Sequence, residues 1–319
     1  MTVTTLGSLW DSTRMRLLVE IERTGSLSAA AQAIGIGQPS ASQHLRLLET
    51  AAGQRLVERG GRGSRLTEAG KVLAGRAAQA IASLQAAEEE LAALAGLQTG
   101  TIHLGASTVP GVYLLPDTLG CFQRDYPSVR VEVEIGSSGE ILQRLLAGRF
   151  QLALVGSEES DERVAVEPYL DDEVVGVARP GLLPLRRGRL EPAALAGHTL
   201  LAREPGSGTQ RLVDEELQAA GARPAGVWEL GSSEALKRAA REGLGVAFLS
   251  RYAVAEEVER GELEAFRLAG RPPLRRRFLV ARLAGRPPSP AEQAFVATLT
   301  QCCAKSADYA QACVGAPRR

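Results

Sequence analysis

The chain has 319 residues, and its 37 Lys and Arg balance its 37 Asp and Glu, so the formal net charge is zero. This balance excludes a polycationic nucleic-acid binder, and any contact with DNA must come from local charge. The apolar runs are shorter than a membrane span, and residues 1–10 lack the basic and apolar regions of a secretory signal. We therefore expect a multidomain cytoplasmic protein without membrane contact. The cysteines match neither a disulfide framework nor a metal-ligand spacing; they are Cys121, Cys302, Cys303 and Cys313.

The first two predicted helices are short and closely connected. Residues 13–24 form a helical pattern that ends at Gly25, where glycine suits a helix C-terminus. Ser28 is expected to cap a second helix over residues 29–34, whose alanines allow another helix to approach. Residues 34–37 then form a tight, glycine-containing turn into a third helix. This order predicts a helix-turn-helix.

The third predicted helix starts at Gln38-Pro39, since proline suits a first helical turn. An apolar stripe at helical spacing consists of Ala41, Leu45, Leu48 and Ala52. The opposite face carries short polar side chains and one arginine, which can reach base edges and phosphates. With the preceding helix, the expected DNA-binding residues are Ser28, Gln38, Pro39, Ser40, Ser42, Gln43 and Arg46. Taken alone, the same pattern also fits a solvated amphipathic helix.

A glycine-rich turn follows, and it predicts a β-hairpin wing. Residues 54–59 and 64–67 flank Gly60-Gly61-Arg62-Gly63. Arg62 is expected near the tip, with Arg59 and Arg65 beside it, where guanidinium groups suit phosphate or minor-groove contacts. A polar surface hairpin without a ligand is the alternative.

A long helix is predicted from a cap at Thr67 to about Leu94. Its apolar seam alternates spacings of four and three through Leu73, Ala77, Ala80, Leu84, Ala87, Leu91 and Leu94. A heptad pattern over three repeats predicts a two-stranded coiled coil, and hence a homodimer. Such a helix would be about 40 Å long, enough to hold two DNA-binding modules apart. A long helix packed on its own domain is the alternative, and residues 96–100 form the hinge to the next domain.

From Thr101 the pattern changes to strands that alternate with helices. The predicted strands are 102–106, 129–135, 152–155, 174–178, 199–202, 227–230, 246–249 and 278–281. Helices are predicted near 113–124 and 140–147, after Thr209 and Glu234, and from Pro290 to about Cys302. The alternation predicts parallel sheet covered by helices. The tail after about residue 305 has no strong pattern and is expected to be partly disordered.

These segments together resemble the LysR-type transcriptional regulators. The residues that carry the resemblance are Thr24 to Ala31, Gln38 to Gln43, Leu48-Glu49, Ala52-Gly53, Arg55-Leu56, Arg59 and Leu66 to Gly70. Leu18 and Val57 stand where that family more often has Phe, and they fill the same apolar roles.

The resemblance implies a multidomain fold. Its parts are a winged helix-turn-helix DNA-binding domain (1–66), a linker and dimerisation helix (67–96), a two-lobed α/β effector domain similar to periplasmic binding proteins (97–305) and a tail (306–319). Lobe I would comprise about 101–172 and 268–305, and lobe II about 173–267. The implied function is a ligand-responsive regulator that binds a two-fold-related double-stranded DNA operator as a homotetramer. RNA polymerase would be a further partner if the protein activates transcription.

Ligands of open α/β sheets lie beyond the carboxyl ends of the strands. In this chain those positions are rich in hydroxyls and glycines, and the effector-binding candidates are Ser107, Thr108, Ser137, Ser138, Arg203, Ser207, Gly208 and Thr209. Hydroxyls, backbone N–H groups and a helix N-terminus suit a small anion. No Lys follows Gly208, which excludes a Walker A loop. Gly/Ser-rich turns that only cap helices are the alternative.

The loop Gly206 to Thr209, with Ala106 to Thr108 and Leu114 to Pro116, is similar to the family branches tied to sulphur assimilation or carbon fixation. This resemblance implies a small effector, either a sulphur oxyanion or a small carboxylate; no cofactor or metal is expected. Gln210 stands where an Arg often follows such a loop, which weakens the charge argument.

Three other functions account for parts of the sequence. An enzyme is not expected, because His44, His103 and His198 lack motif partners such as Gly-x-Ser-x-Gly or His-Glu-x-x-His. A transporter's solute-binding protein would need export and would lack residues 13–94. An α/β solute-binding or enzyme domain fused to a DNA-binding module, without ligand-controlled transcription, is the remaining alternative.

Overall fold

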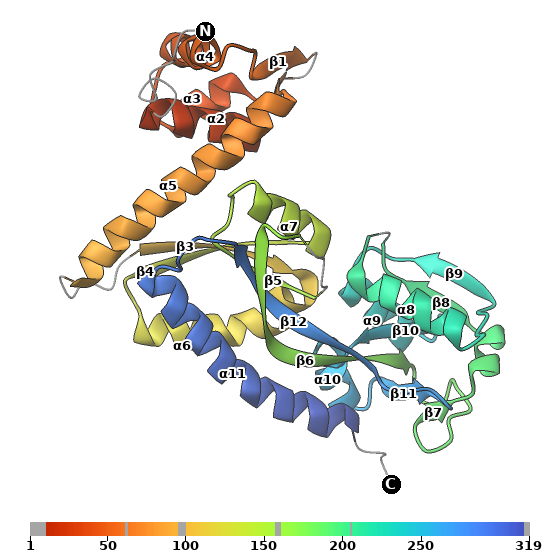
Figure 1. The fold of residues 1–319 in the computed structure, drawn as a ribbon. Helices are drawn as coiled ribbons and strands as arrows, with labels where there is room; N and C mark the ends of the chain where they lie inside the picture. Colours follow the sequence, from red (N-terminus) through yellow and green to blue (C-terminus); the bar gives the residue numbers. More distant parts are fainter. Residues whose placement is uncertain (1–10, 61–62, 95–99, 157–160, 205, 316–319) are drawn as a thin grey trace.

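The computed structural model describes residues 11–60, 63–94, 100–156, 161–204 and 206–315 (Figure 1). A helical module at the amino-terminal end leads through one long helix into an α/β domain with two lobes. Within the described ranges, no helix combines the length and apolar character that crossing a bilayer requires.

The first module packs α2 (Ser12–Thr24), α3 (Leu27–Ala33) and α4 (Gln38–Ala52) around one small core. Its buried side chains include Leu17, Leu18, Ile21, Ala30, Ala41 and Leu48. The predicted cap of α3 was wrong: the N-cap is Ser26, whose Oγ accepts from the backbone N–H of Ala29 at 3.4 Å. Ser26 has the extended backbone that capping requires, whereas Ser28 lies inside the helix and is exposed.

The wing is a hairpin of β1 (Val57–Gly60) and β2 (Gly63–Leu66), with Arg59 opposite Ser64. It is tied to α4, because the Glu49 carboxylate accepts from the backbone N–H groups of Leu56 at 2.9 Å and Val57 at 3.3 Å. Gly63 lies against the module, where a Cβ atom would be 2.5 Å from the carbonyl oxygen of Gly25. The wing is therefore held in a fixed position relative to α4.

The long helix α5 (Glu68–Leu94) begins after Thr67, whose Oγ1 accepts from the backbone N–H of Gly70 at 3.0 Å. The first half of the predicted seam packs within the chain: Ala77 is buried and Leu73 packs on the winged module. The second half is open, since Leu84 is 59% and Leu91 68% exposed. The seam thus serves the chain's own packing at one end and leaves an apolar stripe at the other.

One mixed sheet runs through both lobes, in the order β4-β3-β5-β12-β6-β10-β8-β9, and β11 pairs with β6 and β7. In lobe I, β3 (Gly100–Ser107), β4 (Val129–Gly136) and β5 (Leu152–Val155) are parallel and connected through η1 (Pro110–Leu114), α6 (Leu115–Asp125) and α7 (Ser138–Leu146). In lobe II, β8 (Thr199–Ala202), β9 (Gly226–Glu229) and β10 (Val246–Ser250) are parallel, with α8 (Gly208–Ala219) and α9 (Ser233–Arg241) between them. The remaining elements of lobe II are β7 (Arg189–Leu190), η2 (Pro192–Gly197), α10 (Arg251–Glu259) and β11 (Glu264–Leu268).

Two long antiparallel strands join the lobes, β6 (Val164–Ala178) and β12 (Leu274–Leu283) (Figure 1). The sequence predicted only the apolar end of each. The missed half of β6 is rich in carboxylates, and some of these pair with arginines of β12, as Asp172 does with Arg276 at 2.8 Å. Such pairing across two strands replaces the apolar alternation on which the prediction relied.

The last helix, α11 (Pro290–Gly315), is longer than predicted, so the expectation of disorder was wrong for residues 306–315, while residues 316–319 lie outside the described residues. No Gly or Pro interrupts the alanine-rich segment between Cys302 and Gly315, and Ala310 is buried. The helix continues because its apolar residues still have a surface to pack on.

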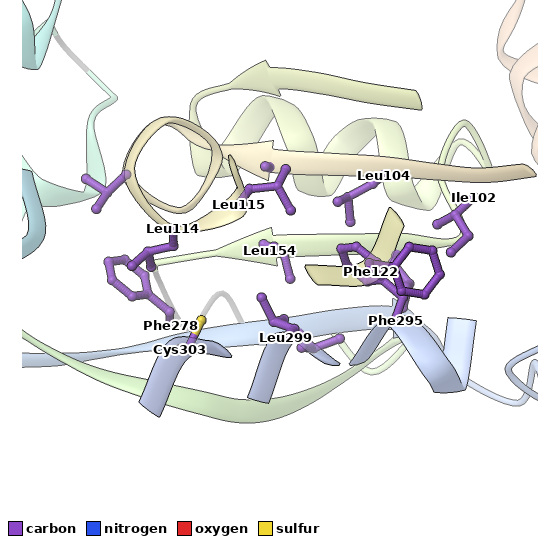
Figure 2. Close-up of a cluster of buried hydrophobic side chains, with 14 of the residues drawn as sticks. Ile102, Leu104, Leu114, Leu115, Phe122, Leu154, Phe278, Phe295, Leu299 and Cys303 are labelled. Carbon is purple, nitrogen blue, oxygen red and sulfur yellow. The ribbon is translucent and has the colours of Figure 1, made fainter. Parts of the chain in front are cut away.

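The core of lobe I lies between the sheet and the helices α6 and α11. Figure 2 shows Leu104 and Leu154 of the sheet facing Phe122, Phe295 and Leu299 of the helices. Phe122 and Phe295 meet edge to face, with ring centroids 5.2 Å apart. Each fully buried side chain of this size contributes roughly 1.5–3 kcal/mol to folding. The core thereby fixes the strand ends at which the candidate site lies.

Candidate functional site

A small cavity, partly open to solvent, lies between the lobes at the carboxyl ends of β3, β5 and β8. Its lining consists of Ser107, Thr108, Val109, Ser137, Ser138 and Gly156 of lobe I, Arg203, Glu204, Ser207, Gly208 and Thr209 of lobe II, and Arg276 and Phe278 of β12. The structure therefore brings all eight effector-binding candidates to one cavity. Glu204 and Arg276 also line the cavity and were not among the residues predicted from the sequence.

Two helix N-termini point toward this cavity. Ser137 caps α7: its Oγ accepts from the backbone N–H of Glu140 at 3.3 Å, and the Glu140 carboxylate accepts from the backbone N–H of Ser137 at 3.0 Å. Ser207 caps α8 and accepts from the backbone N–H of Gln210 at 3.5 Å. Both hydroxyls thus serve as caps, the role given by the alternative interpretation. The helix ends still supply partial positive charge to the cavity lining.

Arg203 faces the cavity, but its charge is largely matched. Its guanidinium donates to both carboxylate oxygens of Glu204, at 2.7 Å each, and to Ser233 Oγ at 2.9 Å. Gln210, the departure noted in the sequence, accepts from the backbone N–H of Arg203 at 2.9 Å. Gln210 therefore positions Arg203 and contributes no charge of its own.

Arg276 supplies the second guanidinium. Its Nε donates to Asp172 Oδ2 and its Nη1 donates to Thr209 Oγ1, both at 2.8 Å. Asp172 is fully buried and also accepts from Ser250 Oγ at 2.7 Å. Burial raises the pKa of Asp172, and the adjacent Arg276 opposes that rise. The pair links the two connecting strands to the start of α8.

A further contact joins the lobes beside Arg203. The Tyr113 hydroxyl of lobe I donates to Glu234 Oε1 of lobe II at 2.7 Å. Lys237 is buried and pairs with Glu234 and Glu257, at 2.7 Å each. Burial, together with the hydrogen bond to Glu234, raises the pKa of Tyr113. No sequence pattern indicates this contact, because Tyr113 and Glu234 lie more than a hundred residues apart in the chain.

Of the predicted DNA-binding residues, Ser28 lies on α3, and the others that the structure describes lie on α4 and the wing. Gln38, Pro39, Gln43 and Arg46 are exposed, while Ser40 and Ser42 are half-buried beside the apolar stripe. Arg65 of β2 is exposed; Arg62 lies outside the described residues, and only the backbone of Arg59 is described. Residues 11–66 contain eight arginines against five carboxylates, so this module has the local positive charge that the whole chain lacks.

The described residues contain no group of three or more His, Cys, Asp or Glu side chains placed to hold a metal ion. His103 pairs with Glu132, with Nδ1 and Oε2 3.1 Å apart. His44 lies on α4, so neither side chain belongs to the cavity between the lobes.

Both parts of the chain match known families. Residues 12–71 match the bacterial regulatory helix-turn-helix protein family of the LysR type, and residues 95–304 match the LysR substrate binding domain. The transcriptional regulator CbbR of Xanthobacter flavus is 31% identical over 295 residues, which cover 90% of this chain and 86% of CbbR. Neither the two family matches nor CbbR supports the alternative of a fused domain without ligand-controlled transcription.

Solved structures agree with the fold. Full-length OxyR from Pseudomonas aeruginosa has a TM-score of 0.74 at 20% identity and covers 92% of this chain and 98% of its own. The regulatory domain of CcmR from Synechocystis, in complex with 2-PG, has a TM-score of 0.59 at 29% identity, covering 64% of this chain and 97% of that domain. The chain therefore belongs to the LysR family of ligand-responsive, DNA-binding transcriptional regulators.

Proposed function

We propose that this regulator senses a small anion in the cavity between its lobes. The observation that carries the proposal is the convergence of two helix N-termini, several hydroxyls and two guanidinium groups on one cavity between the lobes. This donor set suits an oxyanion, because helix N-termini, hydroxyls and guanidinium groups stabilise the charge of anionic oxygens or donate hydrogen bonds to them. The 2-PG bound to the related CcmR domain supports a small ligand for this type of domain. A sulphur oxyanion or a small carboxylate fits the same chemistry, and no metal or cofactor is needed.

For the DNA-binding end, a cytoplasmic dimer would place two α4 helices in successive major grooves of a two-fold-related operator. The side chains that would contact base edges or position the helix in the groove are Gln38, Ser40, Ser42, Gln43 and Arg46. Pro39 and Ser28 would lie beside the DNA backbone, and the wing arginines would contact phosphates. Two such dimers would form a tetramer through the effector domains, and an activator would also contact RNA polymerase. The effector would act by binding two arrangements of the lobes with different affinity.

The first test is thermal unfolding of the purified chain with sulfite, sulfate, thiosulfate, 2-PG and small carboxylates. An anion at about 100 times its Kd stabilises by about 2.7 kcal/mol, which raises the Tm of a domain of this size by about 5–10 °C. Thr209→Val should abolish that rise because it removes the acceptor for Arg276 and one cavity hydroxyl. Operator binding without effector should remain, since α4 and the wing are unchanged.

Thr209→Ser is the matched control, because it keeps the hydroxyl and should keep the response. If none of the anions raises the Tm of the wild-type chain, the anion proposal is wrong and the search moves to larger or neutral metabolites. If Thr209→Val responds as the wild type does, the ligand binds elsewhere in the domain.

Arg46→Ala tests the DNA-binding face. The side chain is exposed on the polar side of α4, and losing one base or phosphate contact costs about 1–3 kcal/mol. We expect operator affinity at fixed salt to fall by roughly 5- to 100-fold. Fluorescence anisotropy across a salt series measures this affinity. Loss of a phosphate contact also lowers the slope of log affinity against log salt concentration by about one.

Arg16→Ala is the charge-matched control, because Arg16 is exposed on α2 and is not among the predicted contacts. It should change operator affinity much less than Arg46→Ala does. Equal losses from the two variants would show that only net charge matters, which would contradict a specific role for Arg46.

A further inference from the structure

The guanidinium of Arg276 is held in place with part of its donor capacity unused. The side chain is 10% exposed and lines the cavity. Its Nε and Nη1 are occupied by Asp172 and Thr209. Its Nη2 is buried and has no hydrogen-bond partner among the described residues. A buried N–H group without a partner carries a large desolvation penalty, so this position favours an acceptor.

The two cavity arginines differ in this respect. Arg203 donates through Nε, Nη1 and Nη2 to Glu204 and Ser233. The guanidinium of Arg276 also lies over the Phe278 ring, with its Cζ 5.0 Å from the ring centroid, and this cation–π contact helps to hold it in place. Arg276 is therefore oriented before any ligand arrives, with Nη2 left to donate.

We propose that Arg276 receives the anionic head of the effector through Nη2, and that Asp172 limits the strength of this contact. The inference rests on the proposed function and deepens it by naming the residue and the ligand chemistry. The head is an oxyanion, such as a carboxylate, a phosphate or a sulphur oxyanion, because its oxygens accept charge-assisted hydrogen bonds from a guanidinium. The α7 and α8 N-termini and the cavity hydroxyls bind the remaining oxygens.

Asp172 opposes the ligand because it is a second anion on the same guanidinium. Its Oδ2 lies 2.8 Å from Arg276 Nε, and its side chain is fully buried, so water screens it poorly. A variant that removes this charge should bind an oxyanion more tightly. A variant that removes the guanidinium should bind it more weakly. The two opposite signs separate a role in binding from a role in packing, since damage to packing weakens binding in both.

The position of Arg276 also explains how binding reaches the rest of the domain. The side chain belongs to β12, and it contacts β6 through Asp172 and the start of α8 through Thr209. Both strands pass between the lobes, and α8 belongs to lobe II. An oxyanion on Nη2 therefore acts on the segments that set the angle between the lobes.

The test is calorimetric titration of the full chain with sulfite, sulfate and 2-PG. For the anion that binds the wild type, Arg276→Gln should raise the Kd about 10- to 100-fold, the value of one charge-assisted hydrogen bond. Asp172→Asn should lower the Kd about tenfold by removing the opposing charge. The control is Arg275→Gln on the exposed side of β12, which should change the Kd less than twofold.

Arg276→Gln leaves Asp172 without its partner and could misfold, so Asp172→Asn with Arg276→Gln is measured as well. This double variant has no unpaired buried charge, and it should still bind at least tenfold more weakly than Asp172→Asn alone. A wild-type chain that binds none of the anions overturns the proposed function and this inference together. Binding by the wild type that is unchanged in Arg276→Gln and in the double variant overturns this inference alone.

Discussion

Replacing Leu84 and Leu91 of α5 together by Asp should lower operator affinity by about 100-fold or more. Both side chains are largely exposed in the single chain, and they lie seven residues apart on the predicted seam. A dimer binds two half-sites with an avidity gain of about 10²–10⁴, which a charged seam removes. Sedimentation velocity should show a smaller assembly, and anisotropy with the operator should show the loss of affinity.

Val72→Asp is the matched control for this prediction. Val72 is also on α5 and is 69% exposed, but it lies outside the seam. It should leave both the assembly and operator affinity close to the wild-type values. A doubly charged seam with unchanged assembly would mean that α5 does not dimerise the chain, and the alternative of a helix used only for packing would then hold.

The sequence predicted the amino-terminal module well because its periodicity is local. The stripe Ala41, Leu45, Leu48 and Ala52 does face inward, and Gly25 does end the first helix in the left-handed conformation. The N-cap was assigned to Ser28 in error because Ser26 and Ser28 are both suitable capping residues near the start of the helix. Only the backbone angles decide between Ser26 and Ser28, and those depend on the preceding turn.

The cavity could also be located from sequence, because strand ends of a parallel sheet meet at one edge. Arg276 was missed since its strand was recognised only from Phe278 onward. Extending the alternation by two residues would have placed Arg276 on the same face as the buried Phe278, and Arg275 and Arg277 on the other. Its partner Asp172 could not be found, because the register between β6 and β12 is set by contacts about a hundred residues apart.

Asp172→Ala should be the most destabilising substitution among those considered. It leaves the guanidinium of Arg276 buried without its carboxylate, and breaking a buried pair in this way costs about 3–5 kcal/mol. For a domain of this size the Tm should fall by about 6–20 °C. Differential scanning calorimetry of the full chain measures the change in the transition of the effector domain.

Asp172→Asn with Arg276→Gln should lose less stability than Asp172→Ala, because it removes both charges and retains polar groups that can still bond to each other and to Ser250. An oxyanion that binds the wild type should restore part of the Tm of Asp172→Ala, since it offers Arg276 a replacement for the lost carboxylate. It should not restore the Tm of the double variant. If the Tm of Asp172→Ala lies within 2 °C (~0.5–1 kcal/mol) of the wild-type Tm, Arg276 has another acceptor in the absence of ligand. The Asp172–Arg276 pair then does not hold the two strands together.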